Sequence, residues 1–248
     1  MRRWVLLCHL ALLPPLGCVS AQQTGVIALP PDGADTIPGP MPGFGPFERY
    51  TDALLVACPK ILSYDNAVMT RPQSPQLRFH RSVPKEYCAW IYSTPAGQYE
   101  MSLAAMSSRE NQSRCRLPDN VVDARFPDGG VGYVFAVHNH PLGSELSNDD
   151  IGYIVEEAAI HGMTVRVREK EVDLGIAAFF SLSTTADKPS CDGFYLYFPR
   201  TGRLMKWTWS AQHEWSERQY GRVTLTDKPS PPGFEIKLEK VEERPYAC

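Results

Sequence analysis

The chain has 248 residues, of which 43% are hydrophobic and 21% are charged, and this is enough apolar sequence for one well-buried core. Its formal net charge is −3 at pH 7 and its pI is about 6.1. A protein of this charge lacks the basic field that holds a chain on phosphate backbones or anionic membranes, so we expect no nucleic-acid partner.

The first residues predict a secretory signal peptide over residues 1–21. Two arginines precede an apolar run from Trp4 to Leu13, and small residues then precede Gln22. The run is shorter than the roughly 20 residues that span a bilayer, so we expect an exported protein, periplasmic or extracellular, with no membrane span. The alternative is a lipid anchor at Cys18, because the Leu-Gly before it resembles part of a lipoprotein cleavage site.

Loss of this leader leaves five cysteines in the mature chain. Export permits disulfides, but the odd count leaves at least one thiol free or paired with another chain, and the connectivity stays open. No pair has the Cys-x-x-Cys spacing of a zinc knuckle or a redox site, so we expect structural roles for Cys58, Cys88, Cys115, Cys191 and Cys248.

Residues 22–47 are crowded with proline and glycine and predict an extended tether, because such a segment buries too little to offset its ordering entropy. The globular part begins near Phe47. Apolar residues then recur at helical spacing from Tyr50 until Pro59, which is expected to end this first helix.

Strand patterns follow in the middle of the chain. Residues 87–92 and 98–105 flank a Thr-Pro-Ala-Gly turn and predict a hairpin. A short continuous apolar run at 133–137 predicts a strand that is buried on both faces and ends before Pro141.

The strongest helix pattern covers residues 148–161, where apolar residues recur at intervals of three and four and a glycine follows. Later segments predict strands at 164–167 and 175–182, and a hairpin from 193–198 and 204–209; from Asp227 onward the chain is expected to form an extended, charged arm. The predicted fold is α+β, a mixed β-sheet flanked by helices, with a main domain over 48–190 and a hairpin extension with its arm over 191–248.

The most informative stretch begins at His138 and ends at Asp150. Side chains two apart on a strand point the same way, so His138 and His140 project together from the strand end. Ser147 is placed to cap the following helix, which Asp150 opens, and the intervening loop is just long enough to bring that carboxylate back to the two imidazoles. Two imidazole nitrogens and one carboxylate oxygen form a three-ligand zinc site with a fourth position open, as in catalytic zinc centres.

These residues resemble the JAMM metalloproteases, zinc isopeptidases of the MPN type. The signature of that family is a Glu on an early strand, then His-x-His-Pro, then Ser-x-x-Asp, and the segment from Glu86 to Ile91 is similar to the Glu-bearing strand. The resemblance covers roughly residues 48–185. It implies that His138, His140 and Asp150 bind zinc, that Glu86 acts as general acid and base, and that Ser147 stabilises the oxyanion.

Other interpretations of these residues stay open. Glu100 and Glu110 compete with Glu86 for the role of general base, and Asp149 is adjacent to the predicted ligand Asp150. The two histidines on their own could be ordinary strand-end residues that bond to the backbone. The aromatic set Tyr195, Tyr197, Phe198, Trp207 and Trp209 is expected to pack a hairpin rather than to bind a polymer such as a glycan.

The resulting hypothesis is an exported zinc-dependent hydrolase that cleaves a peptide or isopeptide bond by metal-activated water, with a Glu as base. The expected substrate is a protein, a peptide or a peptidoglycan-type cross-link, an inference from the compartment alone. Two alternatives are an inactive binding or scaffold protein that keeps the fold, and a secreted toxin or effector hydrolase.

Overall fold

The computed structural model of this protein describes residues 23–30, 33–69, 83–107, 116–127, 130–182, 189–210, 214–229 and 232–241. The predicted signal peptide, the lipidation alternative at Cys18, and Glu110 all lie outside these residues. Within them, neither helix combines the length and the apolar character needed to cross a bilayer.

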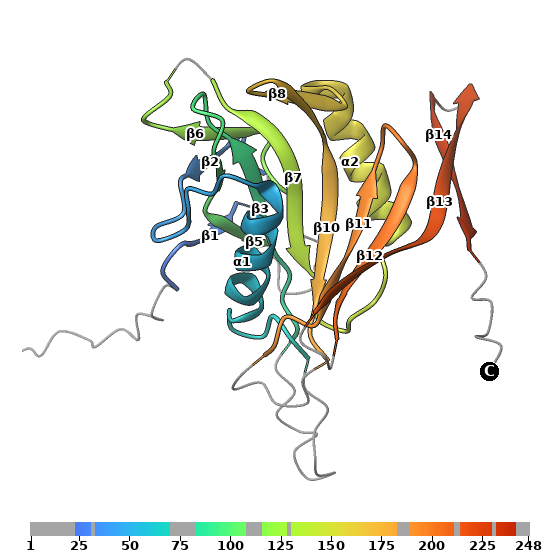
Figure 1. Ribbon diagram of the computed structural model, residues 1–248, viewed down its shortest axis with the longest axis horizontal. Coiled ribbons are helices and arrows are strands. Elements are labelled where there is room, and N and C mark those ends of the chain that lie inside the picture. Colours follow the sequence, from blue (N-terminus) through green and yellow to red (C-terminus); the bar gives the residue numbers. More distant parts are fainter. Residues whose placement is uncertain are drawn as a thin grey trace, which may run out of the picture.

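Ten strands form one mixed sheet. They are β1 (Val26–Leu29), β3 (Tyr87–Ser93), β4 (Tyr99–Met101), β5 (Ala104–Ser107), β7 (Gly132–Asn139), β10 (Gly175–Phe180), β11 (Gly193–Phe198), β12 (Arg203–Trp209), β13 (Trp215–Pro229) and β14 (Pro232–Lys240). The strand order is β1-β5-β3-β7-β10-β11-β12-β13-β14, with β4 paired to β3 (Figure 1). Two small pairs complete the strands, β2 (Thr36–Gly39) with β6 (Asn120–Asp123) and β8 (Thr164–Val167) with β9 (Lys170–Asp173).

One helix covers each face of this sheet. The helix α1 (Tyr50–Leu62) packs on one face, where it buries Ala53, Leu54 and Ala57, and α2 (Asn148–His161) packs on the other, where Ile151 and Ile154 are buried (Figure 1). The middle strand β7 is therefore enclosed on both sides, which explains its continuous apolar sequence. The expected mixed sheet flanked by helices is confirmed at this level, in a fold that is mostly β.

The strand β7, the helix α2 and the strand β10 form a parallel crossover unit. The strands β7 and β10 are neighbours and run parallel, with Ala178 opposite His138, and α2 lies between them in the chain. The observed α2 has the bounds that the periodic pattern predicts, 148–161. The carboxyl end of β7 and the amino end of α2 consequently meet at one edge of the sheet, which is where ligand sites of α/β units usually lie.

The prediction that Pro59 ends the first helix is wrong. Pro59 lies inside α1, which continues to Leu62. Proline removes one backbone donor near the end of the helix, but the final turn is held by tertiary packing, since Ile61 and Leu62 are both buried against the core.

The predicted tether over residues 22–47 is also not a free segment in its described part. Val26 to Leu29 form β1, which pairs with β5, and residues 36–39 form β2, which pairs with β6. The few apolar residues between the prolines, including Ile37 and Met41, are buried. Pairing with an existing sheet supplies the backbone hydrogen bonds and burial that the segment could not supply by itself.

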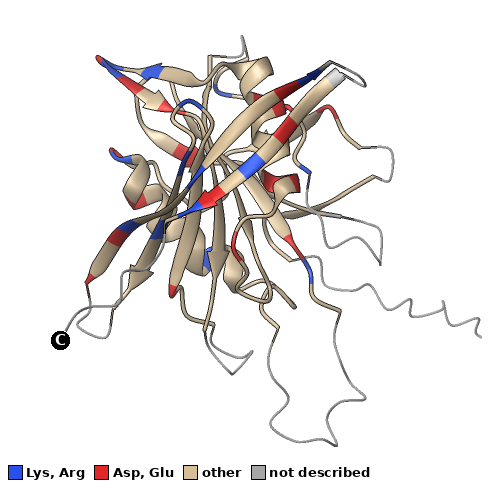
Figure 2. Ribbon diagram, turned by 90° about the vertical axis from the view of Figure 1, so that its right-hand side faces the viewer, with Lys and Arg blue, Asp and Glu red and all other residues tan. Residues whose placement is uncertain are grey.

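The expected extended arm at the C-terminal end is instead a long antiparallel hairpin, β13 and β14, that extends the main sheet. The sheet also runs without interruption from β10 to β11, so the boundary expected at residue 190 does not separate two sheets. Figure 2 shows acidic and basic residues along this hairpin. Charges on an outermost strand oppose pairing with other chains, and Lys240 also pairs with Glu145 beside α2 at 2.8 Å.

The predicted returning strand at 98–105 is divided into β4 and β5. Ser102, at the break, is fully buried; its hydroxyl accepts a hydrogen bond from the Trp90 N–H at 2.9 Å and donates one to the Leu103 carbonyl at 2.8 Å. A side chain here takes the backbone donor that a continuous strand would have taken, and β5 then resumes the pairing with β3 at Cys88 and Tyr87.

Disulfide pairing is consistent with an oxidising compartment. Cys58 of α1 is bonded to Cys191, which precedes β11, and Cys88 is also disulfide-bonded. The first bridge joins segments that are 133 residues apart in the chain, so it constrains the unfolded state strongly.

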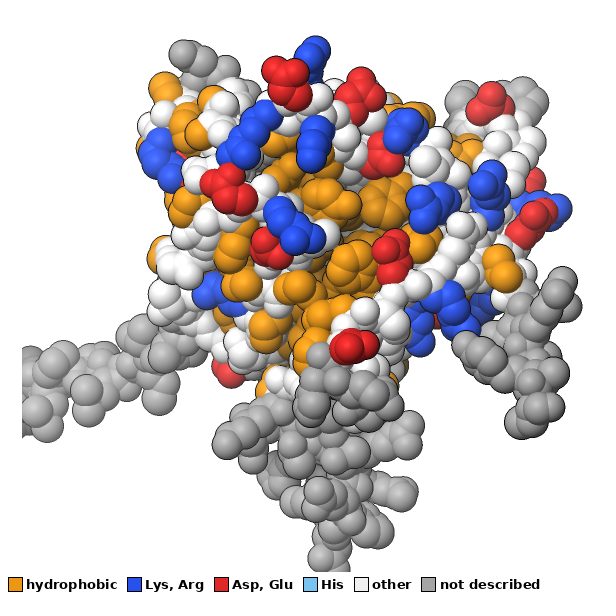
Figure 3. Space-filling model, viewed as in Figure 1, with side chains coloured by type: hydrophobic (Ala, Val, Ile, Leu, Met, Phe, Trp, Pro, Cys, Tyr) orange, Lys and Arg blue, Asp and Glu red, His pale blue; other side chains and the backbone are white. Residues whose placement is uncertain are grey.

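The aromatic residues of β11 and β12 divide between the two faces. Tyr195 and Tyr197 are buried on the side of α2, while Trp207 stacks on Phe194 on the side of α1. Figure 3 shows apolar side chains gathered near the centre of the α1 face. The packing role expected for this set fits all of these side chains, and Trp209 is the most exposed aromatic of the hairpin, at 39%.

We expect Arg125→Ala to destabilise the fold by about 2 kcal/mol. The guanidinium pairs with the buried carboxylates of Glu100 and Asp123 at 2.5 and 2.6 Å, and it is 48% exposed, so the loss should be below the roughly 3–5 kcal/mol of a fully buried pair. Urea unfolding at pH 7 measures the effect. The matched control Arg168→Ala breaks an exposed pair with Glu48 and should cost under about 1 kcal/mol.

The same variant has an expected pH dependence. Hydrogen bonds from Arg125 hold the pKa of Asp123 below its usual range. A lowered native pKa gives stability that is present above the unfolded value of about 4 and is lost as pH falls through the native value. The difference in free energy of unfolding between wild type and Arg125→Ala should therefore shrink on acidification. A difference that grows in acid would contradict this assignment.

Candidate metal centre

The candidate ligands come from the end of β7 and the start of α2. His138 and Asn139 are the last two residues of β7. His140 follows, and its backbone N–H donates a hydrogen bond to the Phe179 carbonyl of β10 at 2.8 Å. The imidazoles of His138 and His140 therefore lie on the same face of the sheet, the one that α2 covers. Both are buried, at 5% and 6% exposure.

Ser147 and Asp150 form a capping box at the N-terminus of α2. The Ser147 side chain accepts a hydrogen bond from the Asp150 N–H at 3.2 Å, and the Asp150 carboxylate accepts one from the Ser147 N–H at 2.7 Å. This reciprocal arrangement satisfies two otherwise unpaired helix donors and fixes the first turn. It also fixes the direction of the Asp150 side chain, which points back toward β7.

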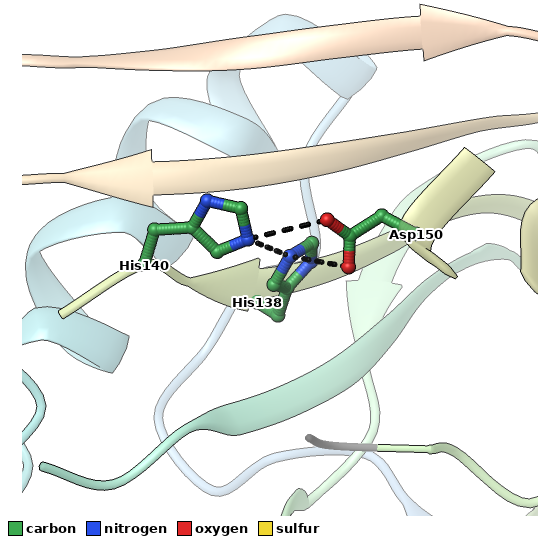
Figure 4. Close-up of side chains that lie close together, drawn as sticks. All are labelled: His138, His140 and Asp150. Carbon is green, nitrogen blue, oxygen red and sulfur yellow. Dashed lines mark hydrogen bonds and ion pairs between the residues drawn. The ribbon is translucent and has the colours of Figure 1, made fainter. Parts of the chain in front are cut away.

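Three candidate ligand atoms converge as a result (Figure 4). The two imidazole Nε2 atoms are 2.8 Å apart, and each is 3.4 Å from one oxygen of the Asp150 carboxylate. Ligands bound tetrahedrally to zinc at about 2.0–2.1 Å lie about 3.3–3.4 Å from one another. The separations from His138 to Oδ1 and from His140 to Oδ2 have this size, while the 2.8 Å between the two nitrogens is shorter. The buried group His138, His140 and Asp150 could hold a metal ion.

The chemistry of the donor set favours zinc over the hard cations. Calcium and magnesium take oxygen ligands almost exclusively, whereas zinc binds imidazole nitrogen and carboxylate oxygen. Three protein ligands leave a fourth position open, which is the pattern of catalytic rather than structural zinc sites.

A hydrogen bond from His140 fixes the orientation of its ring. Its Nδ1 lies 2.7 Å from the Ser144 carbonyl oxygen, an acceptor, so this nitrogen carries the proton and donates it. The Nε2 is then the ring atom that faces His138 and Asp150, and in the neutral ring it carries the lone pair that a metal would take. Ser144 was not anticipated from the sequence, because its role depends on how the loop folds back.

The electrostatics of the cluster follow from its tight packing. Burial by itself would lower the pKa of His140, but the hydrogen bond and negative charge of Asp150 outweigh burial and raise it above its ordinary value. Burial by itself would raise the pKa of Asp150, but the two imidazoles outweigh burial and hold this pKa below its usual range. The carboxylate is therefore charged at neutral pH, as a metal ligand must be.

Glu86 lies beside this group, just before β3. Cys88 of β3 is directly opposite His138 in the ladder, and the charge of Glu86 contributes to the raised pKa of His140. A cavity of about 760 Å³ is lined by Glu86 together with His138, His140, Ser147 and Asp150. This volume is typical of sites that take a small molecule or a short peptide segment.

Neither of the two competing carboxylates that the structure describes, Glu100 and Asp149, belongs to the converging group. Glu100 is on β4, buried at 3% exposure, and is paired with Arg125 rather than directed at the histidines. Asp149 lines the cavity but is exposed and is not one of the three converging residues. Of the carboxylates considered as bases, Glu86 is therefore the one that the described structure brings to the cavity.

No protein-family model, curated protein or solved structure matches this chain. The resemblance to the JAMM metalloproteases accordingly depends on the motif residues themselves and on their arrangement in this structure.

Proposed function

We propose that this chain is an exported zinc-dependent hydrolase of amide bonds, a peptidase or isopeptidase of the JAMM type. The observation that supports it most directly is the convergence of His138, His140 and Asp150 in a cavity that Glu86 also lines. Three ligands with an open position and a neighbouring carboxylate base are the components that metal-assisted hydrolysis requires.

Each residue has a distinct role in this proposal. His138, His140 and Asp150 hold the ion, and Glu86 removes the proton from the attacking water and delivers it to the leaving amine. Zinc supplies Lewis acidity, which polarises the substrate carbonyl and lowers the pKa of water to about 7. The Ser147 hydroxyl, 2.7 Å from a carboxylate oxygen of Asp150, holds that ligand in place, and its position in the cavity lining is compatible with a contact to the substrate oxyanion.

The proposed compartment limits the classes of substrate that the protein can meet. A leader-like N-terminus and disulfides support export, and exported hydrolases meet secreted proteins, peptides and cell-wall cross-links rather than cytosolic proteins. We therefore propose an amide bond in a peptide or in a peptidoglycan-type cross-link as the target.

Metal removal and restoration test this function. The purified chain, stripped with a chelator, should be inactive, and one equivalent of zinc per chain should restore cleavage. A suitable panel contains linear peptides, lysine isopeptides and cross-linked peptidoglycan fragments, with products identified by mass spectrometry. Equal cleavage by the stripped and reloaded protein would overturn the proposal. Zinc binding with no cleavage of any amide would instead favour a binding or scaffold role.

A further inference from the structure

Asn139 lies between the two histidines but points to the opposite face of β7, because successive side chains of a strand alternate. It is completely buried, at 0% exposure. A primary amide in this position must find hydrogen-bond partners, because a buried polar atom left without one costs about 1–3 kcal/mol. The identity of those partners is therefore informative.

Within the described residues it makes three hydrogen bonds, and all of them go to backbone atoms. The Oδ1 atom accepts from the Tyr87 N–H at 2.7 Å, and the Nδ2 atom donates to the Lys85 carbonyl at 3.0 Å and to the Ala67 carbonyl at 2.6 Å. Two of the three partners immediately flank Glu86 in the chain. One side chain thus binds the backbone on both sides of the candidate base.

These hydrogen bonds lie just beyond the last residue pair of the ladder between β3 and β7. The last register pair between β3 and β7 is Cys88 with His138, so the backbone of residues 85–87 has no ladder partner on β7. The Asn139 amide takes the place of that missing pairing. Its bond to Ala67 also ties this segment to the loop that follows α1.

We propose that Asn139 is a positioning residue that sets where the Glu86 carboxylate lies relative to the metal ligands. The inference rests on the proposed function. Asn139 lies between His138 and His140 in the same three-residue stretch, so its hydrogen bonds fix the position of the backbone around Glu86 relative to the candidate ligands. A displacement of about 1 Å in a reacting group can cost about 100-fold in rate, so such a coupling matters for catalysis even though Asn139 touches no substrate.

The chain offers a matched control at the middle of β3. Ser102 is also fully buried and also binds a β3 backbone N–H, that of Trp90, with its side chain. Ser102→Ala therefore removes a buried side-chain-to-backbone bond on the same strand, but away from Glu86. A merely structural role of Asn139 would make the two variants behave alike.

The test uses Co²⁺ in place of zinc, because Co²⁺ binds similar nitrogen and oxygen sites and its visible absorption bands respond to ligand geometry and to groups at its open position. Spectra are compared for wild type, Glu86→Gln, Asn139→Ala, Ser102→Ala and the double variant Glu86→Gln with Asn139→Ala. Urea unfolding and metal content are measured on every sample. Asn139→Ser, which keeps a polar group, serves if the alanine variant does not fold.

We expect Asn139→Ala to bind one Co²⁺ per chain with the spectral change that Glu86→Gln produces, and the double variant to show no further change. Ser102→Ala should keep the wild-type spectrum. On any amide that wild type cleaves, Asn139→Ala should lower kcat about 100-fold with KM little changed. A wild-type spectrum in Asn139→Ala, a spectrum insensitive to Glu86→Gln, or equal changes in Asn139→Ala and Ser102→Ala would each overturn the inference while leaving metal binding intact. Failure of the wild-type chain to bind Co²⁺ or zinc would instead overturn the proposed function, and this inference with it.

Discussion

Glu86→Gln should leave zinc binding near one ion per chain and lower kcat by about 10³-fold, within the 10²–10⁴-fold range of general acid–base catalysis. The substitution keeps the size and polarity of the side chain and removes only its ability to accept and deliver a proton. Because the three ligands are untouched, the metal content should not change. The lost transition-state stabilisation corresponds to about 4 kcal/mol.

The experiment combines metal content by mass spectrometry with steady-state kinetics on an amide that the wild type cleaves. Glu145→Gln is the matched control, since it makes the same chemical change in the loop before α2, where Glu145 pairs with Lys240 and does not line the cavity. Near-wild-type kcat in Glu86→Gln would show that another group acts as the base and would remove Glu86 from the mechanism.

Asp150→Asn should weaken zinc binding by more than about 100-fold. Loss of an outer group that only orients a ligand typically costs 10–100-fold in metal affinity, and here a charged ligand itself is replaced by a neutral amide. The two imidazoles would then have to hold a divalent ion without the negative charge that lies 3.4 Å from each of them. Competition titration against a zinc chelator measures the change.

Asp149→Asn is the control for this effect. Asp149 and Asp150 are consecutive in the first turn of α2, so both substitutions remove one favourable charge from the helix N-terminus, worth about 0.3–1 kcal/mol. Only Asp150 converges on the histidines. We therefore expect Asp149→Asn to keep the wild-type affinity for zinc. Zinc should also raise the thermal stability of this variant, because a ligand that binds the native state stabilises it. Equal losses of affinity in the two variants would contradict the assignment of Asp150 as a ligand.

Several elements were predictable because they depend on short-range periodicity. The apolar spacing of residues 148–161 predicted α2 with its observed bounds, and the hairpin of β11 and β12 followed from its turn residues. The tether and the terminal arm were not predicted correctly. Their apolar residues are sparse, and they become β1, β2, β13 and β14 only because strands from other parts of the chain offer partners.

The candidate ligand set belongs to the predictable part for the same reason. Strand alternation places His138 and His140 on one face, and the capping pattern directs Asp150 back toward them. One loop, with the strand end before it and the first helical turn after it, is therefore enough to predict the candidate ligands. Glu86 could be named only by resemblance. The sequence left Glu100 as a competitor, and the ion pair that holds Glu100 at Arg125 arises from the packing of separate segments.

The sequence by itself thus determined the elements and candidate ligands that local geometry fixes: the strand end that carries the histidines, the capped helix that carries Asp150, and the mixed α and β character of the chain. The tertiary structure decided which distant groups join them, namely Glu86 beside His140, the Ser144 carbonyl on the His140 ring, and the grip of Asn139 on residues 85 and 87. The physical reason is that these contacts depend on strand pairing and loop closure between segments far apart in the chain, and periodicity along the sequence carries no information about which strands become neighbours.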